Sequence, residues 1–75
     1  MQPHPEISAD PKIMTGLPCI RGTRVTVANV VRQIAAGRSI DELCRDYPYL
    51  TDNSIRAALK FAADVAACET YELAS

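Results

Sequence analysis

The sequence predicts a mainly α fold: a three-helix core with a helix-turn-helix, preceded by a short N-terminal β-hairpin element. Three observations lead to this prediction. Apolar residues recur at helical spacing in three segments of the last two thirds of the chain. A residue type that caps helix N-termini precedes each of these segments. The first third instead holds isolated β-branched residues among prolines and glycines, which is typical of short strands and turns.

The length of 75 residues allows a single domain. We place it at residues 6–70, between a flexible leader (1–5) and a tail (71–75). Pro3 and Pro5 argue against a helix or a strand ladder in the leader. A domain this small is marginally stable by itself and usually gains stability from disulfides, a metal or a partner subunit.

The cysteines and the histidine argue against the first two sources. Without a signal peptide we expect a cytoplasmic protein with reduced thiols, and we interpret the three widely spaced cysteines as small core residues: Cys19, Cys44 and Cys68. No Cys-x-x-Cys pair is present, and the one histidine, His4, lies in the leader. We therefore expect no metal and no cofactor, and a homodimer or higher oligomer as the source of additional stability.

Residues 6–25 are predicted to form short extended pieces and turns. The stretch Ile20–Val25 is typical of a tight hairpin tip in which Gly22 supplies the positive φ. A single hairpin is barely stable in water. We therefore expect it to pack on the helices or on a second copy of itself.

The first helix is predicted over residues 26–36. Thr26 is a suitable N-cap, and Gly37 suits the left-handed position that follows many helices. Its apolar face repeats at helical spacing: Val27, Val30, Val31 and Ile34.

The second helix is predicted over residues 39–46. Ser39 and Glu42 have the spacing of a capping box, in which each side chain bonds the backbone of the other. Pro48 is expected to end it. Its buried face consists of Ile40, Leu43 and Cys44.

The third helix is predicted over residues 51–69, with Thr51 as its N-cap. It has one apolar stripe of Ile55, Leu59, Ala62 and Ala66, and a second stripe of Phe61, Val65 and Cys68. A helix that is apolar over most of its circumference is buried on more than one side. We therefore expect the second stripe to contact another chain, with coverage by the hairpin as the alternative.

Charge and motifs argue against an enzyme and against a membrane protein. The net charge is −1, so the chain is not basic in bulk and any DNA contact needs a local cationic face. His4 has no partner acid or base placed by a motif, and no glycine-rich phosphate loop is present. No apolar run approaches the roughly 18 residues of a membrane helix. We expect no catalytic residues.

The linker Tyr47–Leu50 between the last two helices is slightly longer than the turn of a standard helix-turn-helix. In that motif the start of the second helix enters the major groove of DNA. The candidate base-reading residues are Thr51, Asn53, Ser54 and Arg56, and the candidate phosphate contacts are Arg38, Arg45 and Lys60. An ordinary solvated helix terminus is the alternative.

Arg21 and Arg24 flank the tip of the predicted hairpin. An arginine fork matches carboxylates and phosphates bidentately, so these side chains could fill an acidic pocket of a partner. Alternatively they are solvated, or pair with Asp10 or Glu6 of the same domain.

Several motifs in order resemble one small prokaryotic family over about residues 6–66. They are Asp10-Pro11, Gly16-Leu17-Pro18, Gly22-Thr23-Arg24, Ala36-Gly37, Ser39-Ile40-Asp41-Glu42, Tyr47-Pro48, Leu50-Thr51, and Ile55 with Ala58-Leu59. The chain is identified as a member of the family called domain of unknown function 433, which is described as antitoxin-like.

The resemblance implies a homeodomain-like three-helix core and the role of antitoxin in a type II toxin–antitoxin system. The implied partner is a PIN-like ribonuclease toxin, whose carboxylates hold Mg²⁺. Arg21 and Arg24 are then candidates to replace the metal, and Phe61, Val65 and Cys68 are candidates for further partner contacts. Repression of its own operon through operator DNA is also implied. The alternatives are a stand-alone DNA-binding regulator and an oligomerisation module without a DNA role.

Overall fold

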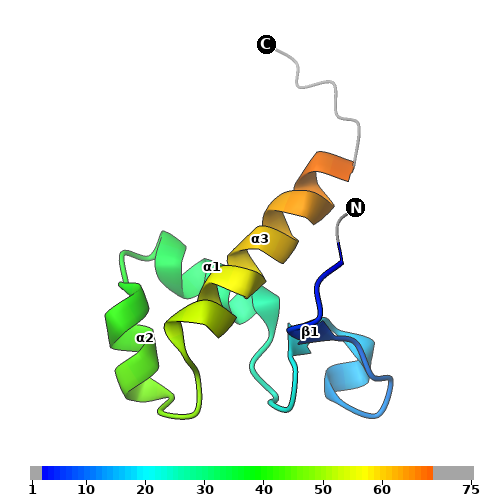
Figure 1. Cartoon of the computed structure of the whole chain (residues 1–75), viewed down its shortest axis with the longest axis horizontal. Helices are drawn as coiled ribbons and strands as arrows, with labels where there is room; N and C mark the ends of the chain where they lie inside the picture. Colours follow the sequence, from blue (N-terminus) through cyan, green and yellow to red (C-terminus); the bar gives the residue numbers. More distant parts are fainter. Residues whose placement is uncertain (1–2, 69–75) are drawn as a thin grey trace.

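The computed structural model describes residues 3–68 (Figure 1). Within this range the chain forms a two-stranded sheet and three α-helices. The elements in order are β1 (Ile7–Ser8), a single 3₁₀ turn (Met14–Gly16), β2 (Cys19–Ile20), α1 (Val27–Ala35), α2 (Ile40–Asp46) and α3 (Asp52–Cys68). The mainly α prediction is therefore confirmed, and the helix bounds agree with the predicted ones to within a residue or two. The predicted tail lies outside the described residues.

The two strands, β1 and β2, are joined by the long loop of residues 9–18 and not by the predicted tight turn at Ile20–Val25. β1 is antiparallel to β2, with Ile7 opposite Ile20 and Ser8 opposite Cys19. The predicted tight turn is present directly after β2. Gly22 has a φ of 80°, and a single bridge beyond the turn joins Cys19 to Thr26. The turn therefore brings the chain back to β2 and delivers it to the start of α1.

The helix caps are those that the sequence predicts. The Thr26 side chain accepts a hydrogen bond from the Asn29 N–H, at 3.0 Å. Ser39 and Glu42 form the complete capping box at the start of α2. Gly37, which follows α1, has a φ of 96°, where a side chain would add strain. These caps satisfy backbone groups at helix ends and so define where α1 ends and α2 begins.

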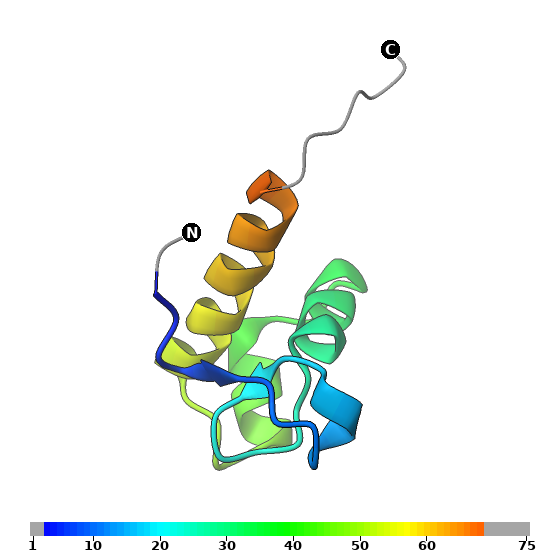
Figure 2. The same cartoon turned by 90° about the vertical axis from the view of Figure 1, so that its right-hand side faces the viewer.

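The core lies where α1 and α2 pack against the first turns of α3 (Figure 2). Ile55 and Ala58 on α3 are completely buried, and Leu43 on α2 is nearly so. Both strands also contact α3, so the hairpin covers part of this helix. The C-terminal turns of α3 extend past the other elements in both views, and Val65 there remains 39% exposed.

The N-terminal segment packs along α3 and is not a loose leader over its described residues. The His4 ring meets the Phe61 ring edge to face, with centroids 5.3 Å apart. His4 Nε2 lies 2.7 Å from Asp64 Oδ2. The prediction that His4 has no partner acid is therefore wrong, because Asp64 lies 60 residues away in the sequence and no motif indicates the contact. Figure 2 shows the segment running beside α3, on the side opposite α1.

Candidate functional site

The first half of α3 presents a polar face to solvent. Asn53, Arg56 and Lys60 are exposed and follow one another at spacings of three and four residues, which places them on one side of the helix. Arg56 Nε is 2.7 Å from Asp52 Oδ2, so one nearby carboxylate already engages this guanidinium. Arg45 is exposed in the last turn of α2. The structure thus gathers three of the predicted DNA contacts on one helix face.

Thr51 and Ser54 form the cap of α3, and Ser54 is buried there. The Ser54 N–H donates to Thr51 Oγ1 at 3.0 Å, and the Thr51 N–H donates to Ser54 Oγ at 2.8 Å. Ser54 is only 6% exposed. The hydroxyl of Ser54 thus already has partners within the cap, and its predicted base contact stays a prediction. Its hydroxyl satisfies the helix terminus from the inner side, where the capping geometry places it.

The N-terminal segment borders the polar face of α3. Pro3, His4, Pro5 and Glu6 line a shallow hollow together with Asn53, Arg56, Ala57 and Lys60. A ligand on this face of α3 therefore meets these N-terminal residues as well. The sequence carries no signal for this neighbourhood, because it depends on the His4–Asp64 contact.

Arg21 is exposed and contacts backbone carbonyls of the N-terminal segment. Its Nε donates to the Pro5 carbonyl at 2.7 Å, and one of its terminal nitrogens donates to the Ile7 carbonyl at 3.2 Å. These carbonyls belong to β1 and to the residues before it. The guanidinium of Arg21 thus ties β1 to the turn that follows β2, and its predicted contact with a partner stays a prediction.

Arg24, in contrast, remains exposed at the turn. Two bonds through one hydroxyl fix the backbone beside it, since Thr23 Oγ1 donates to the Ile20 carbonyl and accepts from the Val25 N–H. Arg24 lines a hollow with Tyr49, which is 63% exposed, and with Ile13, Gly22 and Thr23. The tip arginine and an aromatic side chain of the linker between α2 and α3 thus line the same hollow.

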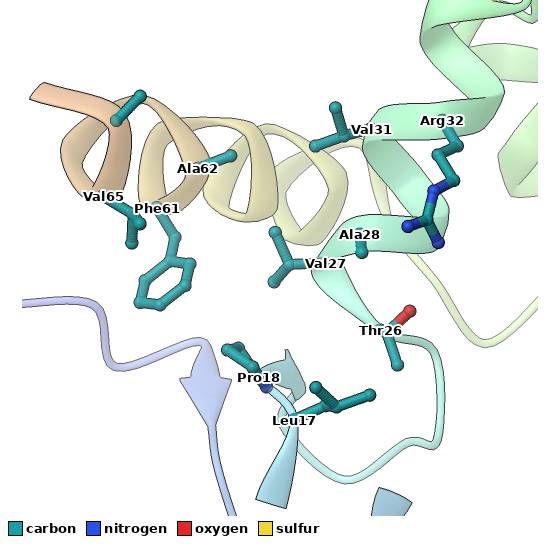
Figure 3. Close-up of a pocket in the computed structure, with 11 residues that line it drawn as sticks. Leu17, Pro18, Thr26, Val27, Ala28, Val31, Arg32, Phe61, Ala62 and Val65 are labelled. Atoms are coloured by element: carbon teal, nitrogen blue, oxygen red, sulfur yellow. The ribbon is translucent and has the colours of Figure 1, made fainter. Parts of the chain in front are cut away.

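An apolar groove runs between α1, α3 and the segment Leu17–Pro18 (Figure 3). Phe61 and Val65 of α3 point into it from one side, and Val27 of α1 points into it from another. Two predicted partner residues thus line one hollow, while the side chain of Cys68 lies outside the description. Leu17 was not predicted as a site residue, although it is 51% exposed at the edge of the groove.

The backbone before Leu17 adopts left-handed conformations that sequence reasoning missed. Met14 and Thr15 have φ values of 50° and 55°, and Gly16 has one of 84°. Only Gly16 signals this in the sequence. Such conformations cost free energy in residues other than glycine. They turn the chain so that Met14 and Leu17 are both exposed.

An ion network joins the end of α1 to α2. Arg38 pairs with Asp46, and its Nε lies 3.6 Å from Glu42 Oε2. The hydrogen bond to Asp46 is the main cause that raises the pKa of Arg38. Hydrogen bonds from the backbone and side chain of Ser39 lower the pKa of Glu42, and Arg38 adds to this effect. Arg38 therefore serves the junction of α1 and α2.

Within residues 3–68, no group of three or more histidine, cysteine, aspartate or glutamate side chains is arranged to hold a metal ion. Cys19, which is buried, and Cys44, which is half-buried, are free thiols. No helix in this part of the chain is long and apolar enough to cross a bilayer.

Comparisons with known proteins place the chain in a family. An uncharacterized protein of Sinorhizobium fredii, y4eO, is 38% identical over 56 residues, which cover 75% of this chain and 25% of that protein. The crystal structure of a DUF433 member from Anabaena variabilis matches with a TM-score of 0.76 and 30% identity, covering 79% of this chain and 58% of the other. The chain thus spans about a quarter and somewhat over half of these two relatives. The model of DUF433, a family of proteins of unknown function, matches residues 7–62, and the chain belongs to this family.

Proposed function

We propose that this chain is the antitoxin of a type II toxin–antitoxin pair and that it binds and inhibits a PIN-like ribonuclease. The observation that carries the proposal is the position of Arg24. Its guanidinium is exposed on a turn whose backbone is fixed by hydrogen bonds through Thr23, so little backbone entropy is lost when the turn meets a partner.

The chemistry of such a partner matches an exposed guanidinium. A ribonuclease that holds Mg²⁺ does so with clustered carboxylates, and an arginine fork binds carboxylates bidentately. The guanidinium of Arg24 can thus occupy the position of the metal. Tyr49 lines the same hollow, and arginine and tyrosine are both enriched among the residues that dominate binding energy. We propose that Arg21 contributes only indirectly, by holding β1 against this turn.

Coexpression with the product of the adjacent gene tests the proposal. The tagged chain is expected to copurify with that product and to suppress its ribonuclease activity. Arg24→Ala is expected to relieve the suppression, because the carboxylates of the nuclease would regain their metal. Arg45→Ala is the matched control, since Arg45 is an exposed arginine on another element. Undiminished suppression by Arg24→Ala, or the absence of any complex, would refute this mode of inhibition.

A second function, repression of the operon through DNA binding, is favoured by one observation. Asn53, Arg56 and Lys60 lie exposed on one face of the helix that follows the helix-turn-helix linker. Asparagine and arginine read adenine and guanine edges, and lysine contacts phosphates. This function would require a dimer, because each copy of a helix-turn-helix protein reads one of the two half-sites of an operator.

A further inference from the structure

The groove between α1 and α3 is almost entirely apolar. Its walls are Val27, Ala28 and Val31 from α1 and Phe61, Ala62 and Val65 from α3, with Leu17 and Pro18 at one end. Among the described residues that line it, the polar side chains are Thr26 and Arg32, and the Thr26 hydroxyl already caps α1. The groove therefore offers apolar area and few hydrogen-bonding groups to whatever binds it.

This composition selects a helical ligand over an extended one. A strand that lies in an apolar groove leaves its backbone N–H and C=O groups without partners on that side, at a cost in free energy. A helix satisfies these groups internally and presents only side chains. A groove between two helices, here α1 and α3, can also hold the apolar stripe of a third helix. The ligand is therefore expected to be an amphipathic helix.

Arg32 favours a ligand helix that carries negative charge. It is the one charged side chain among the described residues that line the groove, and it is exposed in the last turn of α1. A carboxylate beside the apolar stripe of a ligand would meet a cation here. In two copies of this chain placed groove to groove, the described lining residues would supply two arginines and no carboxylate. The charge therefore favours a different protein as the ligand.

We propose that this groove binds an acidic amphipathic helix of another protein. The groove is separate from the hollow that contains Arg24. The proposal therefore does not depend on inhibition by that arginine or on the partner being a nuclease.

The test uses two synthetic peptides that differ only in charge. Each has about 14 residues, blocked ends, and leucines at positions i, i+3, i+4 and i+7. One carries glutamates beside the leucine stripe, and the other carries lysines. Fluorescence anisotropy of the labelled peptides, titrated with the full chain at low salt, gives both dissociation constants. The acidic peptide is expected to bind about two to five times more tightly, the range of an exposed ion pair. Arg32→Glu is expected to reverse the preference.

A steric pair of variants locates the binding. Ala28→Gln places a longer uncharged side chain on the groove wall. It is expected to raise the dissociation constant of the acidic peptide at least about tenfold. Ala63→Gln makes the same change at an exposed alanine of α3 that does not line the groove, and is expected to have no effect. Circular dichroism verifies that both variants fold. Absence of binding by either peptide, equal binding of both, or equal effects of the two variants would overturn the proposal.

Discussion

Arginines of this chain differ in what they can bind, because their local acceptors differ. Arg21 faces two backbone carbonyls of the N-terminal segment. Arg38 faces Glu42 and Asp46 one and two helical turns away. Arg24 lies on the outer side of a turn whose own hydrogen bonds run through Thr23. Residue type alone therefore predicts that an arginine can bind an anion, whereas the neighbouring backbone determines whether its guanidinium is still available.

Removal of the Arg21 guanidinium is expected to destabilise the fold. Arg21→Ala leaves the Pro5 and Ile7 carbonyls to water and loosens β1. The free energy of unfolding should fall by about 1 kcal/mol, the usual net value of a hydrogen-bonding side chain. Urea denaturation followed by circular dichroism measures the change. Arg24→Ala is the control and should leave stability unaltered. Equal stabilities for all three proteins would show that the contacts of Arg21 contribute nothing to the fold.

Glu42 is expected to make part of the stability depend on pH. Hydrogen bonds from Ser39 lower its pKa in the folded chain below the ordinary value of 4.5. Its contribution is therefore fully present above that value and is lost as the pH falls through the lowered pKa. Glu42→Gln keeps an acceptor for the capping box but cannot titrate. The wild type should melt at the higher temperature at neutral pH, and the difference should shrink toward about pH 3. A difference that does not change with pH would contradict this account.

At the scale of elements, local signals predicted the helices well and the long-range pairings poorly. Thr26, Ser39 and Thr51 cap the helices because the capping partner lies only three residues away. The pairing of Ile7 with Ile20 closes a loop that no turn motif specifies. The contact of His4 with Asp64 joins the two ends of the domain. Long-range contacts such as these two depend on how the helices pack against one another. Sequence periodicity alone does not predict that packing.

The N-terminal segment is expected to detach from α3 when His4 is replaced. His4→Ala removes both the edge contact with Phe61 and the bond to Asp64. The Ile7 N–H donates to the His4 carbonyl at 3.1 Å, so it reports on the segment directly. Hydrogen exchange at this amide should become several-fold faster, while the exchange rate of the backbone amide of buried Ile55 in α3 should change less. Glu6→Ala is a control in the same segment, and unchanged exchange in His4→Ala would show that other contacts hold the segment.

The whole molecule has one small core and separates its exposed features onto different sides. Ile55 and Ala58 lie at the centre, where the N-terminal half of α3 meets the other elements. The Arg24 hollow, the apolar groove and the polar face of α3 are lined by largely different residues. One small domain therefore carries three surfaces that can be mutated independently. The sequence identified residues of each surface, but it could not separate them, because separation depends on which way each side chain faces.

The net charge of −1 gives the chain no general attraction to DNA. The proposed DNA binding therefore depends on the local cations near the polar face of α3. Binding to the DNA upstream of the operon would then rest on few phosphate contacts, those of Arg45 and Lys60. Neutralising about two phosphates per copy gives a slope near −2 for log K against log salt concentration. Lys60→Ala should reduce this slope by about one unit on any sequence. Asn53→Ala should leave the slope unchanged and weaken binding mainly to the preferred sequence, because it removes a base contact. Titrations at several salt concentrations measure both effects, and operator affinity that persists in an Asn53→Ala/Arg56→Ala variant at fixed salt would place DNA binding elsewhere on the molecule.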